Sequence, residues 1–598
     1  MVALKRLVIA AAAVLLAACS SGGGSTGGGN SPPPPPPPAT VPTGLSGSAP
    51  DSTSVRLSWT ASSAFTSFHI FRNDVEIATT TSTTYTDTGL SASTAYRYFL
   101  RGETATGLSG ASSTITVTTP NMLTLSLAQL IDPAAHSYIM VRDVEFDAAG
   151  NLFITGGAFS ANFPTTAGAY DRTFASGGSS TGTAGPSDAF VMKVSRTGQV
   201  IWSTLIGGPN YDRAYALELA SDGGVIIAGR AGEGFPTTAG VIQPAFAGDA
   251  SPNSLYGKQD GFIAKLSADG SALLWSTYLG DAQSGLLRDV AVDGNNKVYV
   301  AGAGFADFPH VTANAVQPTA RGAFDLVYAR LSANASTLEY GTFLGGTEPS
   351  GATPGTPSIW VTPGREVYVA IEEGGSGAPT TSNAYQRNNA GGDDFLIARF
   401  SATDQLVYAT YLGGSGNEDL ETHNIAVDGS GRLAIASASA STNYPTTPFA
   451  YQPLYGGGSY DGVISILSAD GSSLVASTYL GGSGREDFQG VEFAPDGLLY
   501  ISGGTRSSGL KTTSSAFAAN FSGVEDAIIA GFTGDLRGAP YISYFGGSDE
   551  DISRALDIAS DGAIAFGGHT VSPNFPVAAG GSTAPNGAYT GWFSVLTP

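Results

Sequence analysis

Apolar and polar residues alternate in short runs along most of this chain, and turns rich in Gly and Asp separate the runs. Residues 288–293 and 298–302 are two such runs, and residues 428–431 (Asp-Gly-Ser-Gly) are one of the turns. A period of two is that of a β-strand with one buried face, and short Asp/Gly turns are typical of hairpins. Long stretches with helical periodicity are absent after residue 18. The pattern therefore predicts an all-β protein.

One kind of run begins with Asp, ends in a basic or apolar pair, and recurs seven times after residue 123. The copies begin at Asp188, Asp260, Asp325, Asp394, Asp461, Asp526 and, in degraded form, Thr590. Each repeat also holds two other strand-like runs and a run that ends in Tyr-Leu-Gly-Gly, as at residues 477–482. Four strands per unit, with starts about 64 to 72 residues apart, are typical of a β-propeller.

The two ends of the repeat region are incomplete in complementary ways. Residues 123–130 form a first run without a predecessor, and residues 590–596 form a last run without a successor. An unpaired edge strand exposes backbone amides and carbonyls, so we expect these two runs to pair. The prediction is a β-propeller of seven four-stranded blades that occupies residues 121–598.

The repeats resemble the bacterial β-propeller repeat known as SBBP, which carries a Ser-Thr-Tyr-Leu-Gly-Gly strand and a Phe-Pro-Thr-Thr segment. The first motif occurs here at residues 277–280 and 410–414, and the second at residues 163–166 and 235–238. The copies drift, since residues 510–513 have lost the Phe-Pro pair. The resemblance implies secretion and a propeller fold, but no defined chemistry.

A separate all-β domain is predicted before the repeats, over residues 42–119. The alternation in residues 55–59 places Leu57 and Trp59 on one face of a strand. The segment resembles a fibronectin type III domain, whose core and tyrosine corner fall here on Pro42, Trp59, Tyr85, Leu90 and Tyr96. The resemblance implies a β-sandwich that serves as a spacer, or as a module with weak contacts to glycans or proteins.

The amino terminus has the features of an export signal. Lys5 and Arg6 precede a short apolar run that ends at Ala18, and the next residue, Cys19, is the only cysteine. This arrangement resembles a bacterial lipobox, which implies a signal peptide over residues 1–18 and a diacylglyceryl group on Cys19. Ser20 then implies the outer membrane. Residues 19–41, with seven consecutive prolines at 32–38, are expected to be a tether that is partly stiff.

Charge and composition exclude several classes of partner and site. The net charge of −22 repels phosphate backbones, so nucleic acid is excluded as a partner. We also expect the protein to be a monomer. A single cysteine allows no internal disulfide. The five histidines are scattered without metal-ligand spacing, so zinc is not expected and no cofactor is required.

Four aspartates recur just before the predicted innermost strands, namely Asp212, Asp419, Asp487 and Asp551. In one interpretation each carboxylate caps local backbone amides and fixes the crossing between blades. In the other they line the channel mouth and bind Ca²⁺, which prefers oxygen ligands. The sequence shows no Ser-His-Asp grouping and no phosphate-binding loop, so it names no catalytic residue.

The function that these patterns favour is a non-enzymatic binding or adhesion module at the cell surface, with a glycan or a surface protein as its ligand. One alternative is a propeller hydrolase or lyase that acts on extracellular polysaccharide, and another is a structural scaffold in an envelope assembly. A polar cleft with perturbed carboxylates on the face of the long loops would favour the enzyme. A flat face with exposed aromatic residues would favour binding.

Overall fold

The computed structural model describes residues 41–60, 62–131, 138–248, 254–283, 285–347, 355–578 and 589–598. Every regular element within these ranges is a β-strand, which confirms the all-β prediction. This part of the chain contains no helix long and apolar enough to cross a membrane. The predicted signal peptide and nearly all of the predicted tether, including Cys19, lie outside the described residues.

The first part of the described chain forms two small antiparallel sheets that enclose one apolar core. One sheet has the order β1-β2-β5, and the other has the order β4-β3-β6-β7 with β8 also paired to β6. The buried hydroxyl of Tyr98 donates a 2.8 Å hydrogen bond to Asp87 in this core. The strands are β1 (Ser46–Asp51), β2 (Ser54–Ser58), β3 (Ser67–Arg72), β4 (Val75–Thr80), β5 (Thr84–Thr88), β6 (Ala95–Thr104), β7 (Gly107–Ala111) and β8 (Ile115–Thr118).

Seven further antiparallel sheets follow, and six of them are built from strands that are consecutive in the chain. The first three comprise β10 (Ile139–Phe146), β11 (Leu152–Ala158), β12 (Asp188–Val194) and β13 (Val200–Ile206); β14 (Arg213–Leu219), β15 (Val225–Ala231), β16 (Asp260–Leu266) and β17 (Leu273–Tyr278); and β18 (Leu286–Val292), β19 (Val298–Gly304), β20 (Asp325–Leu331) and β21 (Leu338–Leu344). The next three comprise β22 (Ser358–Val361), β23 (Val367–Glu373), β24 (Asp394–Phe400) and β25 (Leu406–Leu412); β26 (Glu418–Asp419), β27 (Ile425–Val427), β28 (Leu433–Ser439), β29 (Asp461–Leu467) and β30 (Leu474–Leu480); and β31 (Glu486–Phe493), β32 (Leu498–Thr505), β33 (Asp526–Thr533) and β34 (Tyr541–Phe545).

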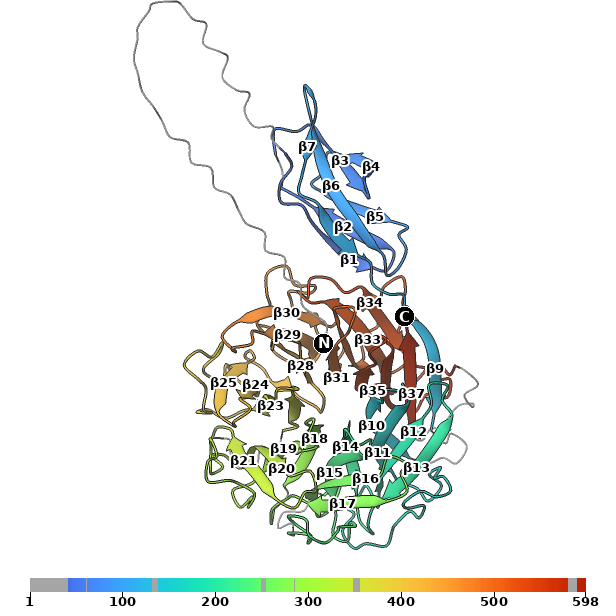
Figure 1. Cartoon of the computed structure of the whole chain (residues 1–598), viewed down its shortest axis with the longest axis vertical. Helices are drawn as coiled ribbons and strands as arrows, with labels where there is room; N and C mark the ends of the chain where they lie inside the picture. Colours follow the sequence, from blue (N-terminus) through green and yellow to red (C-terminus); the bar gives the residue numbers. More distant parts are fainter. Residues whose placement is uncertain are drawn as a thin grey trace, which may run out of the picture.

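The sheets are arranged as propeller-like blades around a common centre (Figure 1). The first strand of each sheet lies innermost and contacts the first strand of the next sheet. These contacts run from β10 through β14, β18, β22, β27, β31 and β35 and return to β10. The innermost strands therefore form the wall of a central channel.

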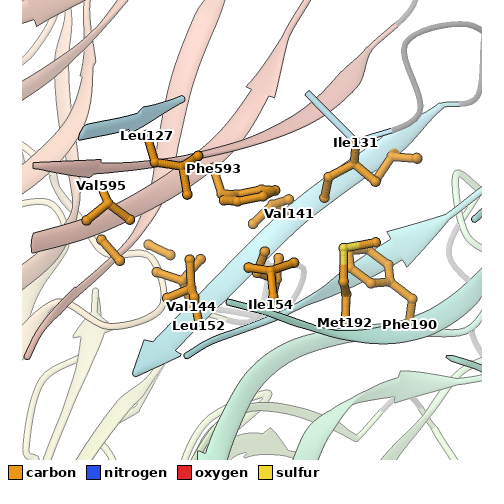
Figure 2. Close-up of a cluster of buried hydrophobic side chains, with 14 of the residues drawn as sticks. Leu127, Ile131, Val141, Val144, Leu152, Ile154, Phe190, Met192, Phe593 and Val595 are labelled. Atoms are coloured by element: carbon orange, nitrogen blue, oxygen red, sulfur yellow. The ribbon is translucent and has the colours of Figure 1, made fainter. Parts of the chain in front are cut away.

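The last sheet joins both ends of the repeat region, as the sequence predicts. Its order is β35 (Asp551–Ile558), β36 (Ile564–Thr570), β37 (Thr590–Thr597) and β9 (Thr124–Leu130). The register places Trp592 opposite Leu130 and Val595 opposite Leu127. Figure 2 shows apolar side chains of this sheet packed against Val141, Ile154 and Met192 of the first sheet. Burial of this apolar surface stabilises the junction.

The recurring Asp and Gly residues have structural roles at the ends of the third and fourth strands. Asp188 and Asp526 are buried and accept hydrogen bonds from the amides of Ala175 (2.9 Å) and Ser522 (2.8 Å) in the preceding loop. A Cβ atom on Gly207 would lie 2.2 Å from Asp188 Oδ1, so the first Gly of Leu-Ile-Gly-Gly, which replaces Tyr-Leu-Gly-Gly in this copy, leaves room for this carboxylate. The repeat signature therefore specifies the fold.

Candidate functional site

Two hollows lie along the central channel, near opposite ends of the innermost strands. Each innermost strand ends in a short hairpin turn, as β14 does before β15. Long loops such as 440–460, which joins β28 to β29, lie at the end where the innermost strands begin. We call these two ends the hairpin side and the loop side.

The hollow on the loop side has a volume of about 340 Å³, and we call it the basic cleft. Five arginines line it, together with two tyrosines, one glutamate and three other residues. The lining residues are Met140, Arg142, Arg213, Tyr215, Arg230, Tyr256, Leu286, Arg288, Thr356, Glu421 and Arg554. A cleft with this excess of positive charge is unexpected in a chain with a net charge of −22.

β-Bulges place several of these side chains in the channel. Arg142, Tyr215, Arg288 and Arg554 are each the extra residue where the register of an innermost strand shifts against its neighbour. A bulge leaves one residue without a partner and turns its side chain away from the regular alternation. In the fifth sheet the innermost strand is interrupted between β26 and β27, and Glu421 comes from this interruption.

Glycines on the second strands make these bulges sterically possible. A Cβ atom on Gly156 would lie 1.8 Å from the carbonyl oxygen of Met140, and one on Gly568 would lie 1.8 Å from that of Ile552. Gly229 and Gly302 are equally crowded by the carbonyls of Arg213 and Leu286. The sequence interpretation missed the cleft residues, although this recurring glycine, paired with a polar residue in the preceding run, is a signal that could have found them.

Tyr215 lies at the centre of the basic cleft, beneath four guanidinium groups. Its ring centroid is 4.3 Å from Arg288 Cζ, 4.5 Å from Arg213 Cζ, 4.7 Å from Arg142 Cζ and 5.1 Å from Arg230 Cζ. Arg213 also donates a hydrogen bond to the Tyr215 hydroxyl. Tyr215 is 0% exposed, and Arg142, Arg213 and Arg230 are 3 to 6% exposed. The charges are therefore held where water screens them little.

This arrangement changes the acidity of Tyr215. Burial alone would raise the pKa of the phenol, but the four arginines outweigh burial and hold the pKa of Tyr215 well below its usual value of 10.0. Burial lowers the pKa of Arg142 and of Arg230 to about 10, so crowding of the cations is costly in the unliganded cleft. A phenol whose pKa is lowered and a surplus of cations at one point are features of a functional site.

Among the described residues that line the basic cleft, Glu421 is the only carboxylate. Its two oxygens lie 3.3 Å from Arg142 Nη2 and 3.7 Å from Arg554 Nη1. Burial would raise the pKa of Glu421, but Arg142, Arg554, Arg288 and Arg213 together lower it. Glu421 therefore stays ionised and neutralises part of the positive charge, leaving net positive charge in the cleft.

The hollow on the hairpin side has a volume of about 280 Å³ and the opposite charge. We call it the acidic pocket, and its carboxylates are Asp143, Glu145, Glu218, Asp289, Glu492 and Asp557. Burial raises the pKa of all six. Four of them accept a backbone amide from the innermost strand of an adjacent sheet: Asp143 from Leu217, Asp289 from Ile359, Glu492 from Ile558 and Asp557 from Phe146.

His423 lies between the two hollows. Its ring nitrogens are each 3.5 Å from a carboxylate, Nε2 from Asp143 and Nδ1 from Asp289, and Nε2 also lies 3.2 Å from the carbonyl oxygen of Tyr215. Burial would lower the pKa of His423, but the two aspartates outweigh it and raise the pKa. The imidazole thus links the acidic pocket to the strand that carries Tyr215.

The four aspartates that the sequence proposes for Ca²⁺ do not occupy equivalent positions. Asp212 accepts amide hydrogen bonds from Gly208 (2.5 Å) and Gly232 (2.8 Å), and Asp551 accepts one from Gly547 (2.6 Å). Asp419 and Asp487 instead lie 2.6 Å and 3.3 Å from Arg485 Nη2. In these two sheets Glu418 and Glu486 accept the loop amides of Gly414 and Gly482.

Among the described residues, no group of three or more His, Cys, Asp and Glu side chains is arranged to hold a metal ion. The interpretation of these carboxylates as caps accounts for the contacts of Asp212 and Asp551. Calcium binding at the four aspartates stays a prediction, and so does the lipidation of Cys19, which lies outside the described residues.

No family model matches the chain. Relatives match short stretches of it: an α-amylase of Niallia circulans is 49% identical over 84 residues, which is 13% of this chain and 6% of that protein. Exoglucanase B of Cellulomonas fimi is 45% identical over 84 residues, 13% of this chain and 8% of the relative. A poly(3-hydroxybutyrate) depolymerase of Ralstonia pickettii is 35% identical over 124 residues, 21% and 23% of the two chains. The chain thus spans less than a quarter of the length of these relatives.

Solved structures resemble most of the chain at low sequence identity. A protein of unknown function from Dyadobacter fermentans covers 80% of this chain and 99% of its own, with a TM-score of 0.36 and 12% identity. An ulvan lyase covers 75% and 91%, with a TM-score of 0.37 and 10% identity. A rhamnogalacturonan lyase of Bacillus licheniformis covers 86% and 91%, with a TM-score of 0.26 and 13% identity.

These findings correct two predictions from the sequence. The leading expectation, a non-enzymatic binding or adhesion module, is wrong, and so is the expectation that the protein is not an enzyme. The relatives that match stretches of the chain are named as an α-amylase, an exoglucanase and a depolymerase, and these are names of enzymes. The loop side carries a polar cleft, but its strongly perturbed groups are a tyrosine and arginines, whereas the carboxylates with raised pKa lie on the hairpin side.

Proposed function

We propose that this protein is a polysaccharide lyase that cleaves a uronate-containing polymer in the basic cleft. The observation that carries the proposal is the cluster of Arg142, Arg213, Arg230 and Arg288 around the buried Tyr215. The proposal extends to this chain the activity on polysaccharides that the names of several relatives state.

The basic cleft suits a carboxylate better than a neutral ligand. A guanidinium group offers paired donors that match the two oxygens of a carboxylate, and burial strengthens the interaction. The surface of an acidic chain repels a polyanion at long range, so binding must come from a local concentration of cations. Arg288 and Arg554 are half-buried and can reach a sugar carboxylate at the cleft mouth.

The chemistry follows from neutralising that carboxylate. Arginines that pair with it withdraw charge and acidify the hydrogen on C5 of the uronate, and a positioned base can then remove it. The phenolate of Tyr215 takes the C5 proton. The C5–H electron pair forms the C4=C5 double bond, and the C4–O bond breaks. The departing glycosidic oxygen takes a proton from the newly formed Tyr215 hydroxyl, which regenerates the phenolate.

A lyase fits this site better than a hydrolase. Most enzymes that hydrolyse glycosidic bonds use two carboxyl groups on opposite sides of the bond, one of them protonated. The basic cleft has only Glu421, whose pKa is lowered rather than raised. The carboxyl groups with raised pKa lie in the acidic pocket, where four of them accept backbone amides that join adjacent sheets.

The test is cleavage of uronate polymers by the full chain, followed through the ultraviolet absorbance of the C4=C5 double bond at the new non-reducing end. We expect absorbance to rise together with falling polymer length. Falling length without the absorbance would indicate hydrolysis and overturn the lyase. Neither change across pectic, algal and animal uronate polymers would overturn the proposed activity.

We further propose that the seven sheets are the blades of a seven-bladed β-propeller of the SBBP-like type, over residues 121–598. The two small sheets would be a fibronectin type III domain, residues 42–119, acting as a spacer. The stretches of 84 residues that match the α-amylase and the exoglucanase have about the length of this domain. Limited digestion with a protease of broad specificity tests these boundaries, because residues 7–55 and 102–141 contain no Lys or Arg for trypsin, and cleavage should fall near residues 41 and 120.

For its location, we propose that the protein is exported and anchored in the bacterial outer membrane by lipid on Cys19, with residues 19–41 as a tether and no nucleic acid partner. The support is the lipobox-like end of the leader and the lack of any other cysteine. Incorporation of labelled palmitate, lost in Cys19→Ser, tests the anchor. Sedimentation of detergent-solubilised protein tests the expected monomer.

A further inference from the structure

A second hollow adjoins the basic cleft on the loop side. It has a volume of about 440 Å³, within the range of roughly 300–1,000 Å³ of small-molecule sites. We call it the aromatic hollow, because Tyr138, Phe159, Tyr211 and Tyr256 line it. It shares Met140, Arg213 and Tyr256 with the basic cleft, so a ligand can extend from one into the other.

The rings of the aromatic hollow contact one another in sequence. Ring centroids are 4.4 Å apart for Tyr138 and Phe159, 5.8 Å for Phe159 and Tyr211, and 4.8 Å for Tyr211 and Tyr256. Tyr138, Phe159 and Tyr256 are half-buried, whereas Tyr211 is fully buried. These edge-to-face and tilted contacts hold the rings in place and leave partly exposed aromatic surface.

The polar groups of the hollow are few. Among the described residues that line it there is no carboxylate, and the one charged side chain is the shared Arg213. The hydroxyl of Tyr211 is buried and has no hydrogen-bond partner among the described residues. A buried hydroxyl without a partner is costly, and a small movement of the rings that lets a ligand hydroxyl reach it would recover that cost. Aromatic walls with one hydroxyl in need of a partner suit the C–H face and the hydroxyls of a sugar ring.

We propose that the aromatic hollow is the subsite for an uncharged sugar next to the uronate. The inference rests on the proposed function and narrows the substrate class to polymers in which a uronate alternates with a neutral sugar. A second uronate in the hollow would bring its carboxylate out of water against aromatic rings without a second cluster of arginines, which is unfavourable.

The experiment compares two classes of polymer with the full chain. One class alternates uronate with an uncharged sugar, as in hyaluronan and unsulfated chondroitin, and the other is all uronate, as in polygalacturonate and polymannuronate. We expect kcat/KM to be at least about tenfold higher for one of the alternating polymers. Tyr211→Phe should lower that value by roughly threefold to tenfold through loss of one hydrogen bond. Phe159→Ala should lower it by about tenfold.

Phe449→Ala is the matched aromatic control. Phe449 is 80% exposed in the loop between β28 and β29 of the fifth sheet, and its loss should leave cleavage unchanged. Thermal unfolding of each variant checks the fold. Since Tyr211→Phe removes only an unpaired hydroxyl, it still tests the subsite if Phe159→Ala is unstable.

The outcomes separate the subsite from the activity. Cleavage of all-uronate polymers as fast as alternating ones, unaffected by Tyr211→Phe and Phe159→Ala, would overturn the subsite and leave the lyase intact. Absence of binding and cleavage for both classes would overturn the lyase and the subsite with it. Selective cleavage of an alternating polymer that the two variants weaken, with Phe449→Ala unchanged, would support both.

Discussion

The two ends of the central channel differ in charge although the same strands build them. On β10, Arg142 lines the basic cleft, whereas Asp143 and Glu145 line the acidic pocket. On β14, Tyr215 lines the basic cleft and Glu218 lines the acidic pocket. On β18, Arg288 lines the basic cleft and Asp289 lines the acidic pocket. The bulge in each strand separates neighbouring residues into two environments.

Comparison of the basic cleft with the acidic pocket shows that pKa values are shifted for two different reasons in this molecule. In the acidic pocket, burial raises the pKa of carboxyl groups, several of which accept backbone amides that join adjacent sheets. In the basic cleft the arginines outnumber the one carboxylate that could neutralise them, and they lower the pKa of a tyrosine. The first arrangement is structural, and the second leaves charge free for a ligand.

The largest expected effect concerns the centre of the basic cleft. Tyr215→Phe should lower kcat by about a thousandfold, because general-base catalysis contributes roughly 10²–10⁴. Polymer binding should persist, since the four arginines remain. Steady-state kinetics and calorimetric binding measure the two effects.

Tyr328→Phe is the control for this variant. Tyr328 is also fully buried, its hydroxyl lacks a partner among the described residues, and it lies in the third sheet away from the cleft. Equal losses of activity in both variants would point to a general effect of removing a hydroxyl. Retention of activity in Tyr215→Phe would rule out Tyr215 as the base.

The next effect concerns the arginines. Arg288→Ala should weaken polymer binding about thirtyfold, since a charge-assisted hydrogen bond contributes roughly 1.5–3 kcal/mol. It should also shift the acid limb of the pH–rate profile to higher pH. The phenolate is the active form, so activity is lost as pH falls through the pKa of Tyr215, and removal of a nearby cation raises that pKa.

Arg288→Lys should restore part of the binding and return the acid limb toward its original position, because it keeps the charge. Arg196→Ala removes an exposed arginine paired with Asp561 and should change neither quantity. An acid limb that stays in place in Arg288→Ala would show that the arginines do not set the pKa of the catalytic base.

A smaller effect is expected at the other end of the channel. Burial raises the pKa of Glu492 well above 4.5, so the folded protein binds a proton there that the unfolded chain releases at neutral pH. The free energy of unfolding should therefore fall as pH rises from about 5 toward 8. Glu492→Gln should make that fall smaller, measured by urea unfolding across this range.

The comparison variant for pH dependence is Asp269→Asn in an exposed hairpin turn. Hydrogen bonds from Ser267 and Ser271 lower the pKa of Asp269 to about 2, so its contribution to stability is lost only as pH falls below about 4. The slope between about pH 5 and 8 should stay unchanged in this variant. An unchanged slope in Glu492→Gln as well would show that Glu492 is ionised in the folded protein.

The smallest expected effect concerns calcium. Because Asp212 and Asp551 accept loop amides and Asp419 and Asp487 pair with Arg485, we expect chelation to leave the Tm unchanged. If calcium raises the Tm and chelation lowers it, the folded protein binds a stabilising cation. Repeating the Tm measurement with and without calcium on Asp419→Asn would then test whether the cation binds at the loop-side rim of the channel.

Most of the strand architecture could be predicted from the chain itself. The alternation of apolar residues and the recurring turns mark the strands, and the incomplete runs at 123–130 and 590–596 predict the pairing of β9 with β37. The Asp and Gly of the signature were recognised as repeats, but their role was not. Only the structure shows that Asp188 caps a loop and that Gly207 leaves room for it.

The candidate site was harder to predict, because its residues are dispersed. Arg142, Tyr215, Arg288 and Arg554 look like ordinary members of alternating strands, and they are far apart in the chain. Recurrence before the innermost strands is what made candidates of Asp212, Asp419, Asp487 and Asp551. In two of those four sheets the adjacent Glu418 and Glu486 take the capping role.

The sequence by itself determined the strands, their repetition and the joining of the two ends, because local alternation and complementary edges suffice for these. Tertiary structure decided which polar residues meet. Bulges turn single side chains out of register, and the ring of sheets brings them together from five different strands and from the loops between strands. Burial then gives the resulting cluster a charge and a pKa that no single segment possesses.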